Sequence, residues 1–151
     1  MSTVAISGFD TVIIAGRNIV DFANGDNATL TFPNDLFSVA TGKSGNSIYA
    51  FNETGRQCDV GLRLIRGSAD DKYFNGLMRI MMNDAASFVL MGGTFVKRIG
   101  NGFGFIHSDT YQLTGGVFTK QVEVKSNSEG DVDQSVAIYT LKFTNSPRAI
   151  F

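Results

Sequence analysis

Short apolar runs with a period of two, separated by clusters of turn residues, most constrain how this chain can fold. Val, Ile, Thr and Phe recur in the runs and suit the pleated, half-buried surface of a strand. Gly, Asn, Asp and Ser gather between the runs and supply turns. The pattern predicts a mainly β protein with mostly antiparallel strands, and a length of 151 residues predicts a single domain over 1–151.

Two hairpins are predicted where a turn cluster separates two apolar runs. The first turns at 24–27, between a run that ends at Phe22 and an alternating run over 28–32. The second turns at Gly92-Gly93, between two short apolar runs. In each case the two flanking strands are expected to pair with each other.

The last third of the chain predicts a longer hairpin, with strands at about 118–125 and 133–144 around a turn at 126–131. Val136 and Ile138 are apolar on the face opposite the other apolar residues of the return strand. Both faces of this hairpin therefore need a cover. Either the single helix or a neighbouring copy of the chain could supply the second one.

One amphipathic helix is predicted at about 69–83. Ser68 and Asp71 form the acidic version of a capping box at its start. Apolar residues then recur at i, i+3, i+4 and i+7, which is the spacing of a buried helical stripe. The stripe consists of Phe74, Leu77, Met78 and Met81.

Residues 40–56 are rich in glycine and polar residues and predict a long loop or a flexible hairpin. Ile48, Tyr49 and Phe51 are apolar within it. Two interpretations stay open: these side chains fold back onto their own domain, or they pack on a neighbouring subunit, since long ordered loops are often functional.

The residues that could support catalysis do not form a recognisable motif, and no cofactor or metal is expected. Cys58 lies on the apolar face of a predicted strand with Val60, Leu62 and Leu64, where a thiol behaves as a small hydrophobic group. One Cys and one His, His107, cannot supply four Cys/His zinc ligands. The glycines of 100–105 predict a β-turn, since no helix follows to bind phosphate. We therefore expect no enzyme.

Charge and hydropathy limit the partners. The formal net charge is -1, from 13 Lys+Arg and 14 Asp+Glu, which argues against tight binding of nucleic acid or of an anionic membrane. No apolar stretch is long enough to span a bilayer, and the first residues do not have the pattern of a secretory signal. Folding in a reducing cytoplasm is expected, without membrane binding.

Two long segments resemble a family of phage structural proteins. They are GFDTVIIAGRNIVDFANGDNATLTFPNDLFSVATGKSGNSIYAFNETG near the start and GFGFIHSDTYQLTGGVFTKQVEVKSNSEGDVDQSVAIYTLKF near the end. With the central helix, they make nearly the whole chain similar to the tail tube proteins of contractile-tailed bacteriophages.

The resemblance implies an antiparallel β-sandwich or β-barrel with one flanking helix. Six copies would join their sheets edge to edge into a ring, and rings would stack into a hollow tube that conducts double-stranded DNA during ejection. Partners in the virion tail would be the sheath, the tape measure protein, the baseplate and the tail terminator. Alternatives are a tail terminator, a baseplate tube or a secretion-type delivery tube protein, and less favoured a β-barrel that binds a small ligand.

Two sets of contact residues are expected on this interpretation. The loop at 40–56 would bridge stacked rings through Lys43, Asn46, Ile48, Tyr49, Phe51 and Glu53. Polar strand faces would line the lumen, with the candidates Asp59, Arg63, Thr119, Gln121, Glu123 and Lys125.

Overall fold

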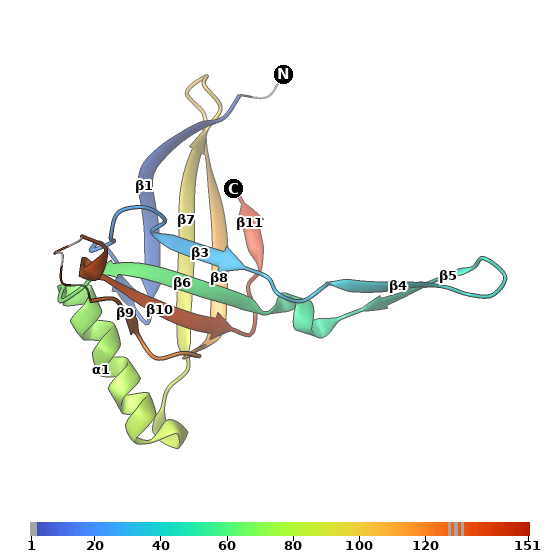
Figure 1. Cartoon of the computed structure of the whole chain (residues 1–151). Coiled ribbons are helices and arrows are strands. Elements are labelled where there is room, and N and C mark those ends of the chain that lie inside the picture. Colours follow the sequence, from blue (N-terminus) through green and yellow to red (C-terminus); the bar gives the residue numbers. More distant parts are fainter. Residues whose placement is uncertain (1–2, 127, 129, 131) are drawn as a thin grey trace.

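The computed structural model describes residues 3–126, 128, 130 and 132–151, and for residues 7–9 the backbone alone (Figure 1). The strands are β1 (Ala5–Ile14), β2 (Arg17–Asn18), β3 (Ala28–Thr31), β4 (Phe37–Thr41), β5 (Ser47–Phe51), β6 (Cys58–Ile65), β7 (Met91–Gly100), β8 (Ile106–Phe118), β9 (Glu123–Val124), β10 (Val136–Phe143) and β11 (Arg148–Ile150). The helices are α1 (Ala69–Asn83) and the short 3₁₀ turns η1 (Glu53–Arg56), η2 (Ala85–Ser87) and η3 (Val132–Ser135).

Nine strands form one antiparallel sheet in the order β2-β1-β7-β8-β10-β6-β3, with β11 on β8 and β9 on β10. The sheet folds into two layers that cross each other (Figure 1). The first layer contains β1, β2, β7, β8 and β11, and the second contains β3, β6, β9 and β10. The strand β8 links them, because it pairs with β7 along its length and with β10 at Phe118. The predicted antiparallel β fold is confirmed.

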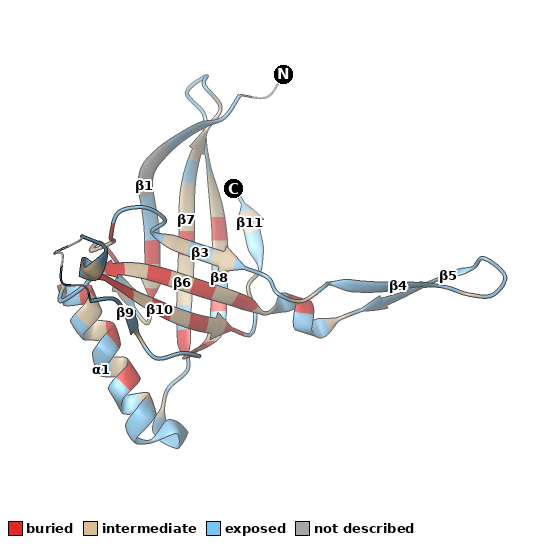
Figure 2. Ribbon diagram, viewed as in Figure 1, coloured by how far each residue is buried: buried red, intermediate tan, exposed pale blue. Residues whose placement is uncertain are grey.

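The core lies between the two layers, where alternate residues of each strand are buried (Figure 2). On β6 the buried side chains are Cys58, Val60, Leu62 and Leu64, as their period of two predicted. On β10 they include Tyr139, Leu141 and Phe143. This burial follows from the alternation of side chains across a pleated strand.

The helix α1 spans Ala69–Asn83, as predicted, and closes one side of the core. The Ser68 hydroxyl accepts a hydrogen bond from the backbone N–H of Asp71 (3.2 Å), which confirms the cap. Phe74 and Met78 are buried, and the Phe74 ring lies 5.9 Å from that of Tyr139. The Tyr139 hydroxyl donates to the Asp71 carbonyl (3.0 Å), so the start of the helix is bonded to the second layer.

The predicted hairpin at Gly92-Gly93 is wrong. Both glycines lie inside β7, at a register shift where the strand passes its neighbours. A Cβ at Gly93 would lie 3.2 Å from the Ile13 carbonyl oxygen. The pair therefore permits a bulge and a close strand contact, rather than a reversal of the chain.

The predicted hairpin around 24–27 is also wrong, although the strand after it is correct. The strand β3 pairs with β6, and Phe22 forms an isolated bridge with Leu64 of β6. The chain reverses earlier, at Ala15-Gly16, where both residues have positive φ (55° and 78°). This two-residue turn joins β1 to β2, and the segment after it crosses to the second layer.

The predicted long hairpin is correct only in its return strand, which is β10. The strand β8 ends at Phe118, and of the expected first strand only Phe118, Glu123 and Val124 pair with β10, with a break in the strand between them. Most of β8 pairs instead with β7 through the glycine-rich turn at 101–105. Within the expected turn at 126–131, residues 127, 129 and 131 lie outside the described residues.

Candidate assembly surfaces

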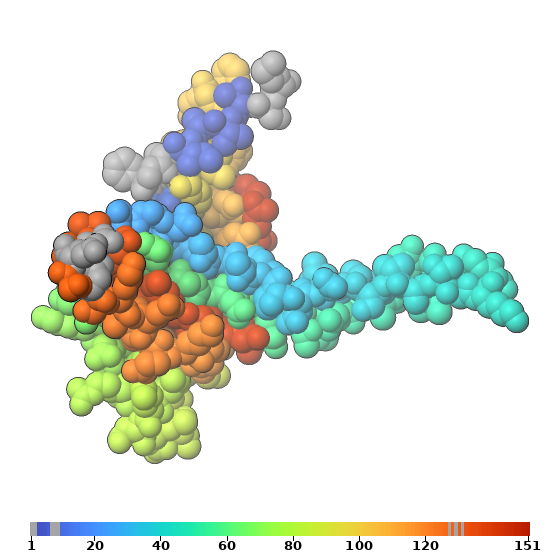
Figure 3. Space-filling view, viewed as in Figure 1, coloured from blue at the N-terminus to red at the C-terminus, as the bar shows by residue number. Residues whose placement is uncertain are grey.

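A two-stranded arm, β4 with β5, projects from the body of the molecule (Figures 1 and 3). All ten residues of the two strands are exposed. The register pairs Phe37 with Phe51 and Val39 with Tyr49, so these four side chains share one face. The Phe37 and Phe51 rings are 5.3 Å apart. The arm therefore presents an apolar face to solvent.

The composition of the arm predicts that it is covered in an assembly. Val39 and Tyr49 are 61% and 67% exposed, and neither strand contains a charged residue. An isolated two-stranded ribbon is marginally stable in water, and apolar faces of this kind are typical of contact surfaces. In the single chain, Ile48, Tyr49 and Phe51 are exposed, so the interpretation that they fold back onto their own domain is wrong.

The six residues predicted for the inter-ring contact are distributed along this arm. Ile48, Tyr49 and Phe51 lie on β5, with Ile48 on the face opposite the other two. Lys43 and Asn46 lie at the tip, which the Gly42 N–H to Asn46 carbonyl bond closes. Glu53 lies at the root, in η1, beside Arg56 (3.3 Å). The arm starts at Phe37, so the predicted loop began too late and missed the two apolar residues of β4.

The root of the arm is fixed to the body by hydrogen bonds. The Asn34 side-chain amide donates to the Thr54 carbonyl (3.2 Å), and the Asn52 N–H donates to the Leu36 carbonyl (2.7 Å). Gly55 is buried there, and a Cβ on it would lie 2.8 Å from the Asp35 carbonyl oxygen. These contacts hold the base of the arm in one place, which favours a defined docking geometry.

The first layer has a free edge on each side. The strand β2 pairs with β1 only at Ile13 and Ile14, which leaves the outer edge of β1 without a partner strand from Ala5 to Asp10 among the described residues. Among the strands that the structure describes, β11 pairs with β8 alone. Backbone groups at open edges are templates for pairing with another chain.

The predicted lumen residues all belong to the second layer or to the segment that leads to it. Asp59 and Arg63 alternate with the buried residues of β6 and point away from the core. Glu123 lies on β9. Thr119 and Gln121 lie in the segment before β9 and Lys125 in the segment after it, and neither segment is a strand. Two of these residues form ion pairs: Asp59 Oδ1 lies 4.0 Å from Lys142 Nζ, and Lys125 Nζ lies 3.9 Å from Asp133 Oδ2.

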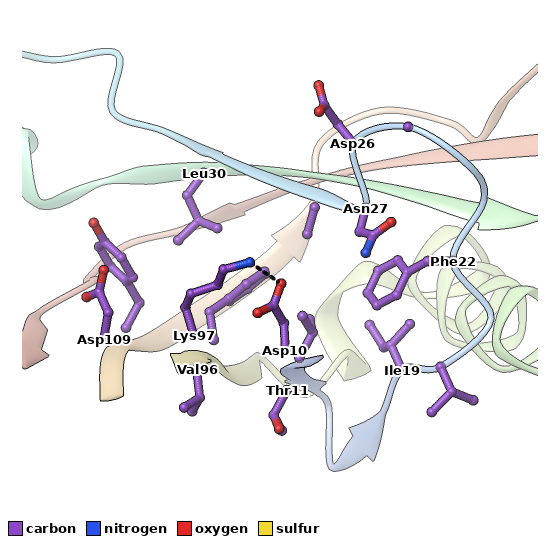
Figure 4. A pocket seen from close by; sticks show the side chains of 16 residues that line it. Asp10, Thr11, Ile19, Phe22, Asp26, Asn27, Leu30, Val96, Lys97 and Asp109 are labelled. Atoms are coloured by element: carbon purple, nitrogen blue, oxygen red, sulfur yellow. Dashed lines mark hydrogen bonds and ion pairs between the residues drawn. The ribbon is translucent and has the colours of Figure 1, made fainter. Parts of the chain in front are cut away.

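A hollow of about 740 Å³ opens between β1, β3 and β7 (Figure 4). Three of its charged side chains form ion pairs, Lys97 with Asp10 (3.0 Å) inside it and Asp109 with Arg148 (2.7 Å) at its margin, and Asp26 also lines it. The Arg148 hydrogen bond lowers the pKa of Asp109. Because the protein satisfies the charges of these ion pairs itself, the hollow does not present them to a small ligand.

The two residues considered for catalysis lie on different layers. His107 is exposed on β8, and Cys58 is fully buried on β6. Burial and the neighbouring Asp59 raise the pKa of the Cys58 thiol to about 11, so the thiol is protonated at neutral pH. In the described part of the chain, no three His, Cys, Asp or Glu residues gather around a possible metal position, and no helix is long and apolar enough to cross a bilayer.

No protein-family model matches the sequence, and no curated protein matches it either. Solved structures do match it over nearly its whole length. One, from the PVC sheath-tube complex of an extracellular contractile injection system, has a TM-score of 0.66 at 11% identity and covers 97% of this chain and 93% of its own. The chain has the fold of contractile-tail tube proteins.

Two further structures with this tube fold come from other parts of such assemblies. A chain of the PVC sheath/tube terminator has a TM-score of 0.63 at 14% identity, with 96% of both chains covered. A chain of the anti-feeding prophage (AFP) baseplate has a TM-score of 0.53 at 14% identity and covers 100% of this chain and 97% of its own. The fold is therefore found in structures of a sheath-tube complex, a terminator and a baseplate.

Proposed function

We propose that this chain is the repeating subunit of the tube of a contractile tail, with no catalytic role. Six copies form a ring, and rings stack into a hollow tube in the virion tail. The observation that carries the proposal is the exposed arm, whose strands present an apolar face and contain no charged residue, on a body with the tube fold. Exposed apolar surfaces of this kind mark contact sites, and in this proposal another copy of the chain covers the arm.

Ring closure through β1 and β11 is supported by the strand directions. Because β1, β7, β8 and β11 are antiparallel in succession, β11 runs opposite to β1. A rotation about an axis along the strands keeps these directions. The free edge of β11 in one copy therefore meets the free edge of β1 in the next copy as an antiparallel pair, and closure removes both edges.

Such a ring would have the first layer as its wall. The face of this layer away from the core carries Thr94, Arg98 and Gln112, which alternate with the core residues of β7 and β8. We propose that this face lines the lumen. The six residues predicted from the sequence, on or near the second layer, remain the alternative.

Labelling of assembled tubes with a bulky maleimide distinguishes the two faces. In tubes of Thr94→Cys protein we expect protection, because the thiol faces a narrow lumen, and in tubes of Asp59→Cys protein we expect rapid labelling. Both positions should react equally in the monomer, which is the control. Protection of position 59 together with labelling of position 94 would favour the sequence-based set.

The arm bridges one ring to the next in this proposal, through the six predicted residues together with Phe37 and Val39. The tube would contact the sheath, the tape measure protein, the baseplate and the tail terminator. In a phage tail it would conduct double-stranded DNA. An injection-system tube with another cargo is the alternative that the PVC and AFP structures favour.

Electron microscopy of the concentrated protein tests the proposal. Hexameric rings and tubes that lengthen with time are expected for a repeating subunit. Rings that never lengthen would instead indicate a terminator, the second candidate, which the terminator structure of the same fold favours. Compact monomers at every concentration would contradict both.

A further inference from the structure

We propose a second stacking contact, head to tail between two copies of this chain, that does not involve the arm. The crown of one copy (Val4, Ile6, Phe103, Phe105 and Ile106) packs on the foot of a copy in the next ring (Ile80, Met82, Val89 and Leu90). This inference rests on the proposed tube function and adds a partner surface to it.

The crown is an ordered turn that holds two aromatic rings in solvent. Phe103 and Phe105 are 79% and 68% exposed. The Asn101 side-chain oxygen accepts from the N–H of Phe103 (2.8 Å), and the Asn101 N–H donates to the Phe105 carbonyl (3.2 Å). Gly102 and Gly104 have φ of 85° and 90°, which L-residues rarely adopt. The backbone is therefore shaped to present the rings.

The foot is an exposed apolar surface at the end of α1 and in the segment that enters β7. Val89 is 81% exposed, Met82 64% and Leu90 61%. Val89 and Leu90 border a hollow of about 520 Å³ that also includes Tyr73 and Leu77 of α1. Ile80 and Met82 border a second hollow, of about 690 Å³, so the foot offers recesses into which the exposed Phe103 and Phe105 rings of a crown can pack.

The two surfaces lie at opposite ends of the same strand. Leu90 directly precedes β7, and the crown turn directly follows it, so ten residues at ~3.3 Å each separate them. Figure 1 shows the turn between β7 and β8 and the end of α1 at opposite extremes of the molecule. A crown therefore cannot reach its own foot, and a contact that repeats head to tail produces a filament.

The exposed apolar area favours a second copy as the occupant. Each of the nine residues of the crown and the foot is at least 54% exposed, and burying them all would approach the roughly 1,000 Å² at which specific interfaces begin. Arg98 flanks the crown, and Arg79 and Asp84 flank the foot. The foot is therefore neutral overall, and apolar fit rather than charge selects the partner.

Disulfide trapping between two single variants tests this contact. Phe103→Cys protein is mixed with Val89→Cys protein, allowed to form tubes and oxidised. We expect a crosslinked dimer of the two variants, and none when Val132→Cys, another exposed valine position, replaces Val89→Cys. Tubes without the 103–89 crosslink would overturn the inference and leave the proposed function intact.

A second measurement uses the double variant Phe103→Ser/Phe105→Ser. This variant should form rings as the wild type does. The protein concentration needed for tubes should rise about tenfold or more, which is the effect expected when central interface residues are lost. Val132→Ser should change neither. Tube growth at the wild-type concentration would overturn the contact, whereas the absence of wild-type rings and tubes would contradict the function itself.

Discussion

At the scale of single residues, Asp70 joins the helix to the first layer. Its buried carboxylate accepts from Arg17 Nε (2.5 Å) and from the N–H groups of Val20 and Asp21 (2.9 Å each). Burial by itself would raise the pKa of Asp70, but these three donors lower it below its ordinary value. No short window of the sequence contains this pair, because Arg17 lies 53 positions from Asp70.

Asp70→Asn should lower the free energy of unfolding by about 2–3 kcal/mol. This is somewhat below the usual cost of breaking a buried ion pair, because the Arg17 side chain is partly exposed to water. Urea unfolding at pH 7 measures this. The stabilisation by the ionised Asp70 carboxylate is fully present above the pKa that Asp70 has in the unfolded chain. It is lost as the pH falls through the lower pKa of the folded state, so the unfolding free energies of the wild type and of Asp70→Asn should converge in acid. Asp10→Asn, in a more exposed pair, should cost under about 1 kcal/mol.

At the scale of elements, the arm is expected to be needed for assembly but not for the folding of the body. Phe37 and Phe51 face each other in the register, so residues 38–50 can be replaced by Asn-Gly without moving the root. We expect the unfolding free energy to change by less than about 1 kcal/mol, since loop length costs little and the arm buries little.

Tubes should not form from this shortened protein, while rings should persist. Sedimentation and electron microscopy measure both. A full-length variant with Lys43→Ala at the tip provides a milder comparison. Tube growth by the shortened protein at the wild-type rate would show that the arm has no part in stacking.

At the scale of the whole molecule, the free edges of the first layer determine whether a ring can close. Phe151 and Ser108 exchange backbone hydrogen bonds (3.0 Å each), so by alternation the N–H of Ile150 points away from β8. Ile150→Pro removes that outward donor without loss of a bond inside the chain.

The proline variant should remain folded, with an unfolding free energy within about 1 kcal/mol of the wild type, and should fail to form rings. Ile150→Ala, which keeps the N–H, should form them. Size-exclusion chromatography with light scattering measures the ring population. Normal rings from the proline variant would exclude β11 as the closing edge.

Features that depend on near neighbours along the chain could be predicted from the amino-acid order. The helix at 69–83, its Ser68 cap and the alternation along β6 follow from spacing and local hydrogen bonds, which a short window of residues contains. Gly92-Gly93 and the turn at 24–27 were misjudged because a glycine permits a bulge as readily as a reversal, and distant strands decide between them. Tertiary structure alone decided that β3 pairs with β6, that Arg17 meets Asp70, and that the arm, crown and foot remain exposed, because burial depends on what the rest of the chain covers.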